Sequence, residues 1–258
     1  TPSQAQNVSY DNIRLNHATS GGLTIDVAAG ESYTYSGTIG SSNPSLAAFS
    51  VTKSGAGTQV LAGSNNYTGR TTVSGGVLEL NSSSGSSLGA STSVTVAAAA
   101  TLLIAQSNQV NDAAAVTLSG GTITRASGVS EALGALNLTA DSTLNFGSGT
   151  GGTLTFGVYE GGLTPDFKLN VTNFFLGNTL VFGSNIGAFI ASSSAGPYSG
   201  TYFAFDQGFT TTAWNGSSFT ITAIPEPSTV VVSLGLTCFM LWSARRRWSR
   251  SPGAPSAG

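Results

Sequence analysis

The sequence predicts an all-β fold: a right-handed parallel β-helix (solenoid) with a small antiparallel β cap, followed by a C-terminal single transmembrane helix. Three observations lead to this prediction. From Gly21 onward, short runs alternate apolar and polar residues and are separated by glycine, serine and asparagine. Apolar residues at matching positions recur about every twenty residues. Near the C-terminus, an apolar run is followed by clustered arginines.

The composition is unusual for an enzyme. Charged residues make up 8% of the 258 residues, against about 25% in ordinary globular domains, and 34 residues are glycine. Hydrophobic residues still make up 40%, which is enough to form a packed core. No basic face with interleaved aromatics is present, so nucleic acid is not an expected partner. The single cysteine, Cys238, cannot form an intrachain disulfide.

Residues 1–20 are expected to form an N-terminal segment or cap. The sequence begins at Thr1, with neither methionine nor a basic and apolar leader. Because the predicted topology requires export, we expect that an export leader has been removed or left out.

Residues 21–156 are predicted to form the β-helix. Val73, Val94, Val116, Leu136 and Leu154 follow one another at intervals of 21, 22, 20 and 18 residues. A strand with one apolar face cannot bury that face alone, but coils stacked about 4.8 Å apart enclose a continuous core. Within a coil, pairs of strands follow each other, as in residues 94–104, 116–123 and 136–146. We expect six or seven coils, with glycines at the bends.

One repeat unit, residues 49–80, resembles a known family. It opens with Lys53-Ser54-Gly55-Ala56-Gly57, continues through a Tyr67-Thr68-Gly69 turn, and ends in a strand over residues 71–78. The Lys-x-Gly-x-Gly opening and the Tyr-Thr-Gly turn resemble the autotransporter-associated β-strand repeat. The resemblance implies a passenger-type β-helix on the outer surface of the cell, and it implies no catalytic residues.

Residues 157–223 are rich in aromatics and are predicted to form the antiparallel β cap. Expected strands cover residues 168–172, 179–182, 200–205 and 218–223. An atypical terminal unit would protect the open sheet edge of the solenoid. Aromatics scattered this evenly are expected in the core; the alternative interpretation is an aromatic platform that binds sugars, with Trp214 as its test residue.

Residues 224–250 form the predicted tail, and residues 251–258 are expected to be disordered. The apolar run over residues 229–244 would form a helix roughly 24 Å long, at the lower edge of spanning length. Clustered arginines stay cytoplasmic, so Arg245, Arg246 and Arg247 form a membrane-stop cluster and place the N-terminal side outside. The alternative is an ordinary single-span tail anchor preceded by a linker.

The tail also resembles a sorting signal. Pro225, Glu226 and Pro227 form an extended hinge, because proline is not accommodated in a regular helix. The order of Pro-Glu-Pro, short apolar helix and arginine cluster resembles the PEP-CTERM signal of Gram-negative bacteria. The resemblance implies that exosortase, a membrane-embedded cysteine-type transpeptidase, recognises the tripeptide and removes the helix.

No catalytic, cofactor-binding or metal-binding residues are predicted. The only histidine, His17, has no acidic pair nearby in the sequence, and the acidic residues are spread singly. Lys53 and Arg70 flank one repeat and would have to meet across a coil to serve a β-helix lyase. We instead expect these cations to be solvent-exposed edge charges.

The leading functional hypothesis is an exported, non-catalytic surface or extracellular-matrix protein. It would be anchored in the inner membrane as a precursor and then released to the cell surface or matrix, where extracellular polysaccharide is a candidate partner. The alternatives are an adhesin or carbohydrate-binding module, and a β-helix polysaccharide lyase or hydrolase.

Overall fold

The computed structural model describes residues 12–14, 22–40, 48–84, 86–160, 167–184, 186, 203–206 and 210–223. The chain divides into two compact units, Thr1–Ile224 and Pro225–Gly258, and every described residue belongs to the first. The described residues form an all-β, right-handed solenoid of about six turns, in which none of them is helical. The predicted β-helix is therefore confirmed, while the helix predicted over residues 229–244 lies outside the described residues.

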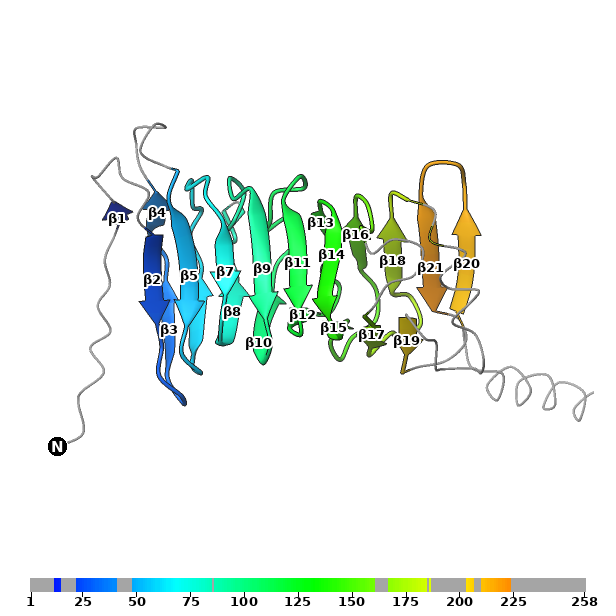
Figure 1. Ribbon diagram of the computed structural model, residues 1–258, viewed down its shortest axis with the longest axis horizontal. Coiled ribbons are helices and arrows are strands. Elements are labelled where there is room, and N and C mark those ends of the chain that lie inside the picture. The colour runs from blue at the N-terminus through cyan, green and yellow to red at the C-terminus, as the bar shows by residue number, and fades with distance from the viewer. Residues whose placement is uncertain are drawn as a thin grey trace, which may run out of the picture. The chain divides into compact units, whose positions relative to one another are not determined.

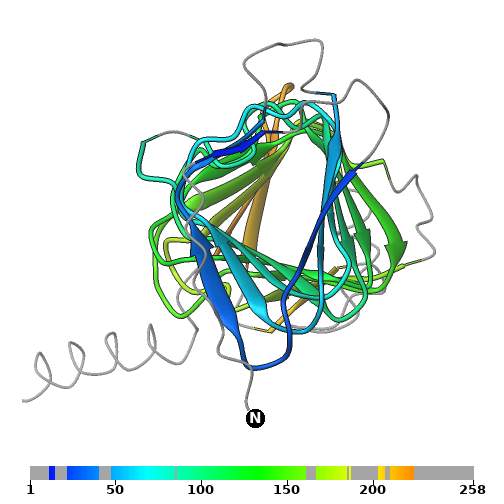
Figure 2. The ribbon, with the colours of Figure 1, turned by 90° about the vertical axis from the view of Figure 1, so that its left-hand side faces the viewer.

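Three sheets form the sides of the solenoid (Figures 1 and 2). Sheet 1 contains β2 (Gly22–Asp26), β5 (Ser50–Ser54), β7 (Thr71–Val73), β9 (Ser93–Ala97), β11 (Ala115–Ser119) and β14 (Leu136–Ala140). Sheet 2 contains β3 (Ser32–Tyr35), β6 (Thr58–Leu61), β8 (Gly76–Leu80), β10 (Ala100–Ile104), β12 (Thr122–Arg125), β15 (Ser142–Asn145), β17 (Leu169–Thr172) and β19 (Phe203–Phe205). Sheet 3 contains β13 (Glu131–Leu133), β16 (Thr153–Phe156), β18 (Thr179–Phe182), β21 (Phe219–Ala223) and β20 (Thr210–Trp214). Two further strands, β1 (Asn12–Arg14) and β4 (Thr38–Gly40), pair in parallel with each other.

The register of sheet 1 confirms part of the predicted repeat. Val94 pairs with Val116, and Val116 pairs with Leu136. Two predicted positions are wrong. Val73 pairs with Val96 rather than with Val94, and Leu154 belongs to sheet 3, so that Tyr159 is the residue bridged to Leu136. The physical reason is that the connections between strands differ in length. Residues at a constant interval in the sequence therefore do not all stack on one another in successive turns.

The predicted antiparallel cap over residues 157–223 is wrong for most of its length. β17 pairs with β15 in parallel, β18 pairs with β16 in parallel, and β19 pairs with β17 in parallel. Only β21 and β20 run antiparallel, on the outer side of β18. Their hairpin turn is stabilised by Asn215, whose side-chain oxygen accepts hydrogen bonds from the main-chain N–H groups of Ser217 and Ser218. The solenoid therefore continues through the aromatic segment and ends in one hairpin.

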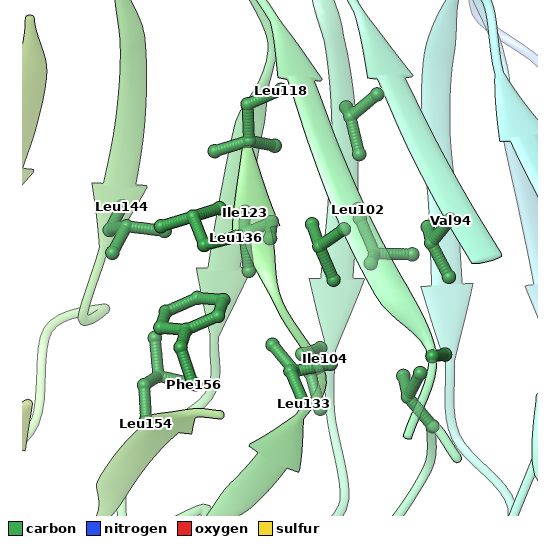
Figure 3. Packing of buried hydrophobic residues seen from close by; sticks show 14 of the residues in the cluster. Val94, Leu102, Ile104, Leu118, Ile123, Leu133, Leu136, Leu144, Leu154 and Phe156 are labelled. Atoms are coloured by element: carbon green, nitrogen blue, oxygen red, sulfur yellow. The ribbon is translucent and has the colours of Figure 1, made fainter. Parts of the chain in front are cut away.

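The core lies inside the three sheets. Alternate residues of each strand point inward, as in β10, where Ala100, Leu102 and Ile104 are buried. Figure 3 shows how side chains from all three sheets, including Val94, Leu102 and Phe156, meet in the interior. Apolar residues of successive turns stack in columns, so the hydrophobic core is continuous along the described solenoid.

Candidate functional site

The residues predicted to direct sorting, Pro225, Glu226 and Pro227, lie outside the described residues, as do Arg245, Arg246 and Arg247. Their roles stay predictions. Within the part of the chain that the structure describes, no helix has the length and apolar character needed to cross a membrane. His17 also lies outside the described residues.

The Lys-x-Gly-x-Gly opening of the repeat forms a contact between successive turns. Lys53 is buried on β5, and its Nζ donates hydrogen bonds to the carbonyl oxygens of Ser54 (2.7 Å), Gly55 (3.0 Å) and Gly75 (3.1 Å). Burial lowers the pKa of Lys53, and the negative charge of Asp26 partly opposes this shift. Lys53 is thus not the exposed edge charge predicted from the sequence, because main-chain oxygens of the bends replace its water shell.

Two glycines of the repeat are required by close approach to the preceding turn. Gly55 has a φ of +73°, and a Cβ atom there would lie 2.1 Å from the carbonyl oxygen of Val27. A Cβ atom on Gly69 would lie 2.1 Å from the carbonyl oxygen of Phe49. In both cases the obstacle is backbone, so no side chain can move aside to make room.

The tyrosine of the Tyr-Thr-Gly turn connects two neighbouring turns. Tyr67 is buried, its ring stacks on Phe49 at 5.8 Å between centroids, and its hydroxyl lies 2.7 Å from the hydroxyl of Thr71. The Thr71 hydroxyl lies 3.0 Å from that of Ser91 in the next turn. Burial raises the pKa of Tyr67, so its phenol stays neutral within this hydroxyl chain.

Four buried polar side chains at matching positions of successive turns form a second connection, which we name the corner ladder (Asn65, Ser87, Gln109 and Glu131). Asn65 accepts a hydrogen bond from the main-chain N–H of Ile39 and donates one to the carbonyl oxygen of Ser87. The Ser87 hydroxyl donates to the side-chain oxygen of Gln109 at 2.8 Å. Each member lies 22 residues after the previous one, so the ladder follows the turn length.

The corner ladder ends in a buried carboxylate. Glu131 accepts hydrogen bonds from the main-chain N–H groups of Gln109 and Val110, both at 2.8 Å. Burial raises the pKa of Glu131 to about 7, although the two N–H groups act in the opposite direction. These four residues were not predicted from the sequence, because the predicted repeat rested on apolar residues alone. The recurrence of a polar side chain every 22 positions is the signal that could have identified them.

Arg125 is a second buried cation, for which the sequence predicted no role. It points inward from β12, where its Nη1 donates to the carbonyl oxygen of Ala126 and its Nη2 to the side-chain oxygen of Asn178. Its guanidinium carbon lies 4.7 Å from the centre of the Phe146 ring. Burial lowers the pKa of Arg125 to about 10. Arg70, in contrast, is exposed, as predicted.

The described aromatics of the C-terminal turns support the core interpretation over the sugar platform. Phe174, Phe182, Phe203 and Phe219 are buried. The ring of Phe174 meets that of Phe146 edge-on at 4.8 Å. Trp214 on β20, with 41% of its surface exposed, is the one aromatic among the exposed large hydrophobic residues of the described part.

Within the described ranges, no three histidine, cysteine, aspartate or glutamate side chains come together as a metal site. The two buried cations contact main-chain, amide and aromatic groups, so these two do not serve a catalytic groove on the surface.

The family model of the passenger-associated-transport-repeat matches residues 51–80. These residues start in β5 and end with β8, and they contain the lysine, glycine and tyrosine contacts described above. No curated protein and no solved structure matches the chain. The match supports an autotransporter-associated β-strand repeat within the solenoid.

Proposed function

We propose that this chain is an exported, non-catalytic surface or extracellular-matrix protein of a Gram-negative bacterium. The observation that carries the proposal is the passenger-associated-transport-repeat at residues 51–80, which forms part of a continuous parallel solenoid. A repeat of this family suggests export or a surface location. Contacts such as that of Lys53 serve the stacking of turns rather than chemistry on a substrate.

Residues 224–250 are the proposed sorting signal. In this proposal the apolar helix over residues 229–244 holds the precursor in the inner membrane, and Arg245, Arg246 and Arg247 stop it there. An exosortase-type transpeptidase then cuts at Pro225-Glu226-Pro227 and releases the solenoid to the cell surface or matrix. The support is the order of these three features in the sequence.

The decisive experiment is intact-mass spectrometry of the exported protein. The full chain, preceded by an export leader, is expressed in a Gram-negative host with and without an exosortase gene. With the gene, we expect a product that ends near residues 225–227 and lacks the arginines. Glu226→Ala should block processing, and Ser228→Ala, just outside the tripeptide, serves as the matched control. A surface product that keeps its arginines in the exosortase host would contradict this route.

A second candidate function, carbohydrate binding, is favoured by one observation, the exposed Trp214 on the terminal hairpin. Glycan-array binding by the purified chain that disappears in Trp214→Ala would establish it. Turnover of an acidic polysaccharide would instead support the lyase or hydrolase alternative and would contradict the non-catalytic proposal.

A further inference from the structure

The tip of the terminal hairpin carries the only Asn-Gly pair in the sequence, Asn215-Gly216. Both residues are exposed and lie in the turn that joins β20 to β21 (Figure 1). Gly216 has a φ of +95°, and a Cβ atom there would meet nothing within 4 Å. Because glycine has no side chain, the main-chain nitrogen that follows Asn215 is open to approach.

Three donors surround the side-chain carbonyl of Asn215. Its Oδ1 accepts hydrogen bonds from the main-chain N–H of Ser217 (2.9 Å), the hydroxyl of Ser217 (3.0 Å) and the main-chain N–H of Ser218 (2.8 Å). The N–H of Asn215 donates in turn to the carbonyl oxygen of Ser218 and closes the turn. Donors placed around a carbonyl oxygen stabilise the negative charge that forms there when a nucleophile adds to the carbon. The turn therefore makes Cγ of Asn215 a better electrophile.

The nitrogen that can attack this carbon and the nitrogen that would leave it are both unbound. In the part of the chain that the structure describes, neither the N–H of Gly216 nor the side-chain NH2 of Asn215 has a hydrogen-bond partner. Attack by the Gly216 nitrogen on Cγ closes a five-membered ring, so the two reacting groups are already held together by the chain.

Other asparagines of the solenoid lack this combination. Asn65 and Asn178 are buried, and the side-chain NH2 of each donates to a main-chain carbonyl oxygen, of Ser87 and Asn173 respectively. Neither of the two is followed by glycine. Asn215 is therefore the asparagine at which ring closure meets the fewest obstacles.

We propose that Asn215 is a self-modification site, which reacts with water to give aspartate and isoaspartate through a cyclic imide. A solvent base removes the proton from the Gly216 nitrogen, which bonds to Cγ while the carbonyl electrons move onto Oδ1. The Cγ–Nδ2 bond then breaks, and the nitrogen takes up a proton and leaves as ammonia. Water adds to either carbonyl of the imide and opens the ring. No oxidant or reductant takes part.

Both products change the end of the solenoid, one residue from the exposed Trp214. Each adds a negative charge at neutral pH. Aspartate leaves the main chain as it was, and its carboxylate accepts the same hydrogen bonds. Isoaspartate leads the main chain through the former side chain and lengthens it by one methylene group, which disturbs the turn between Trp214 and Phe219. This inference goes beyond the proposed function and does not depend on it.

The test follows the purified full chain at mildly alkaline pH in water labelled with heavy oxygen, by peptide mapping and mass spectrometry. The same chain unfolded in urea is the reference. We expect Asn215 to convert before any other asparagine, with label in both products, and several-fold faster in the folded chain than in the unfolded one. A rate in the folded chain that is equal to or below the unfolded rate would overturn the proposal, because the turn would then protect Asn215.

Two alanine substitutions isolate the contribution of the turn. Ser217→Ala removes the hydroxyl donor and keeps the main-chain N–H, so it should slow conversion in the folded chain several-fold and leave the unfolded rate unchanged. Ser218→Ala is the matched control, because Ser218 contacts Oδ1 through its main-chain N–H alone. Equal folded rates in the two variants would contradict the role of the three donors. Far-UV circular dichroism of each variant shows that the fold is retained.

Discussion

The central turns and the C-terminal turns of the solenoid stack on their neighbours through different kinds of side chain. In the central turns the spacing is nearly constant: Thr101 pairs with Thr122, and Thr122 pairs with Thr143, each 21 positions on. Toward the C-terminus the turns lengthen, and Leu169 pairs with Phe203, 34 positions on. The corner ladder lies before the C-terminal turns, from Asn65 to Glu131.

Most of the aromatic contacts lie among the C-terminal turns, although Tyr67 stacks on Phe49 in an early turn. Phe156 stacks on Phe182 at 5.6 Å between centroids, and Phe174 meets Phe205 at 5.4 Å. A hydrogen bond tolerates a change of only a few tenths of an ångström in its donor–acceptor distance, so a polar ladder requires turns of equal length. Aromatic rings gain energy over a range of distances and angles, so they tolerate irregular turns. In the central turns regular spacing thus accompanies the polar ladder, and in the C-terminal turns irregular spacing accompanies most of the aromatic contacts.

The largest expected effect comes from breaking the aromatic stack. Phe182→Ala should lower the free energy of unfolding by about 3–5 kcal/mol, because a fully buried ring is lost and a cavity remains. Chemical denaturation followed by circular dichroism measures this change in the free energy of unfolding. Leu176→Ala, at a residue that is 54% exposed, is the control and should change little. Equal effects of the two substitutions would show that the stack does not stabilise the C-terminal turns.

The second-largest effect is expected from a substitution in the corner ladder. Gln109→Leu leaves the N–H and carbonyl groups of Ser82 and the hydroxyl of Ser87 without their side-chain partner. We expect a loss of about 2–3 kcal/mol in the same denaturation experiment. Gln106→Leu, at an exposed position three residues earlier, is the matched control. A Gln109 variant as stable as the Gln106 variant would mean that the ladder is not a stabilising feature.

A smaller effect is expected from pH. The pKa of Glu131 is raised by burial to about 7 in the folded chain, above its ordinary value of 4.5. The folded state therefore holds this proton more tightly, and the resulting stability is full below pH 4.5 and lost as the pH rises through 7. Unfolding at pH 8 should require about 1–2 kcal/mol less than at pH 5.

Glu131→Gln should flatten this pH dependence, since the amide does not titrate. Glu160→Gln, at an exposed position, should leave the slope as it is in the unchanged chain. A slope that survives Glu131→Gln would assign the pH effect to another group.

The smallest effect is expected at the terminal hairpin. Trp214 is partly exposed, so Trp214→Ala should change the free energy of unfolding by about 0.5 kcal/mol or less. Phe219, its buried cross-strand partner on β21, is the comparison, and Phe219→Ala should cost several times more. A large loss in Trp214→Ala would show that the ring supports the end of the solenoid and would weaken its assignment to a binding role.

Local patterns were enough to predict several features of this protein. Alternation of apolar and polar residues predicted the strands, and the recurring valines and leucines predicted coils that stack in parallel. The Lys-x-Gly-x-Gly and Tyr-Thr-Gly signals located the repeat that the family model matches at residues 51–80. Of the aromatic residues expected in the core after residue 157, Phe174, Phe182, Phe203 and Phe219 are buried, whereas Trp214 is exposed. These features depend on side-chain polarity along a strand, which can be read directly from the sequence.

Other features were decided only by the tertiary structure. Val73 stacks on Val96, and β17 and β18 continue the parallel sheets, because the loops between strands differ in length and set the register. Lys53 and Glu131 are buried although they are ionisable, because their partners are main-chain carbonyl and N–H groups of neighbouring turns. Main-chain groups are common to nearly every residue, so the 22-residue recurrence of polar side chains in the corner ladder could indicate the position of Glu131 but not its partners. Only the stacking of one turn on the next brings these groups within hydrogen-bonding distance.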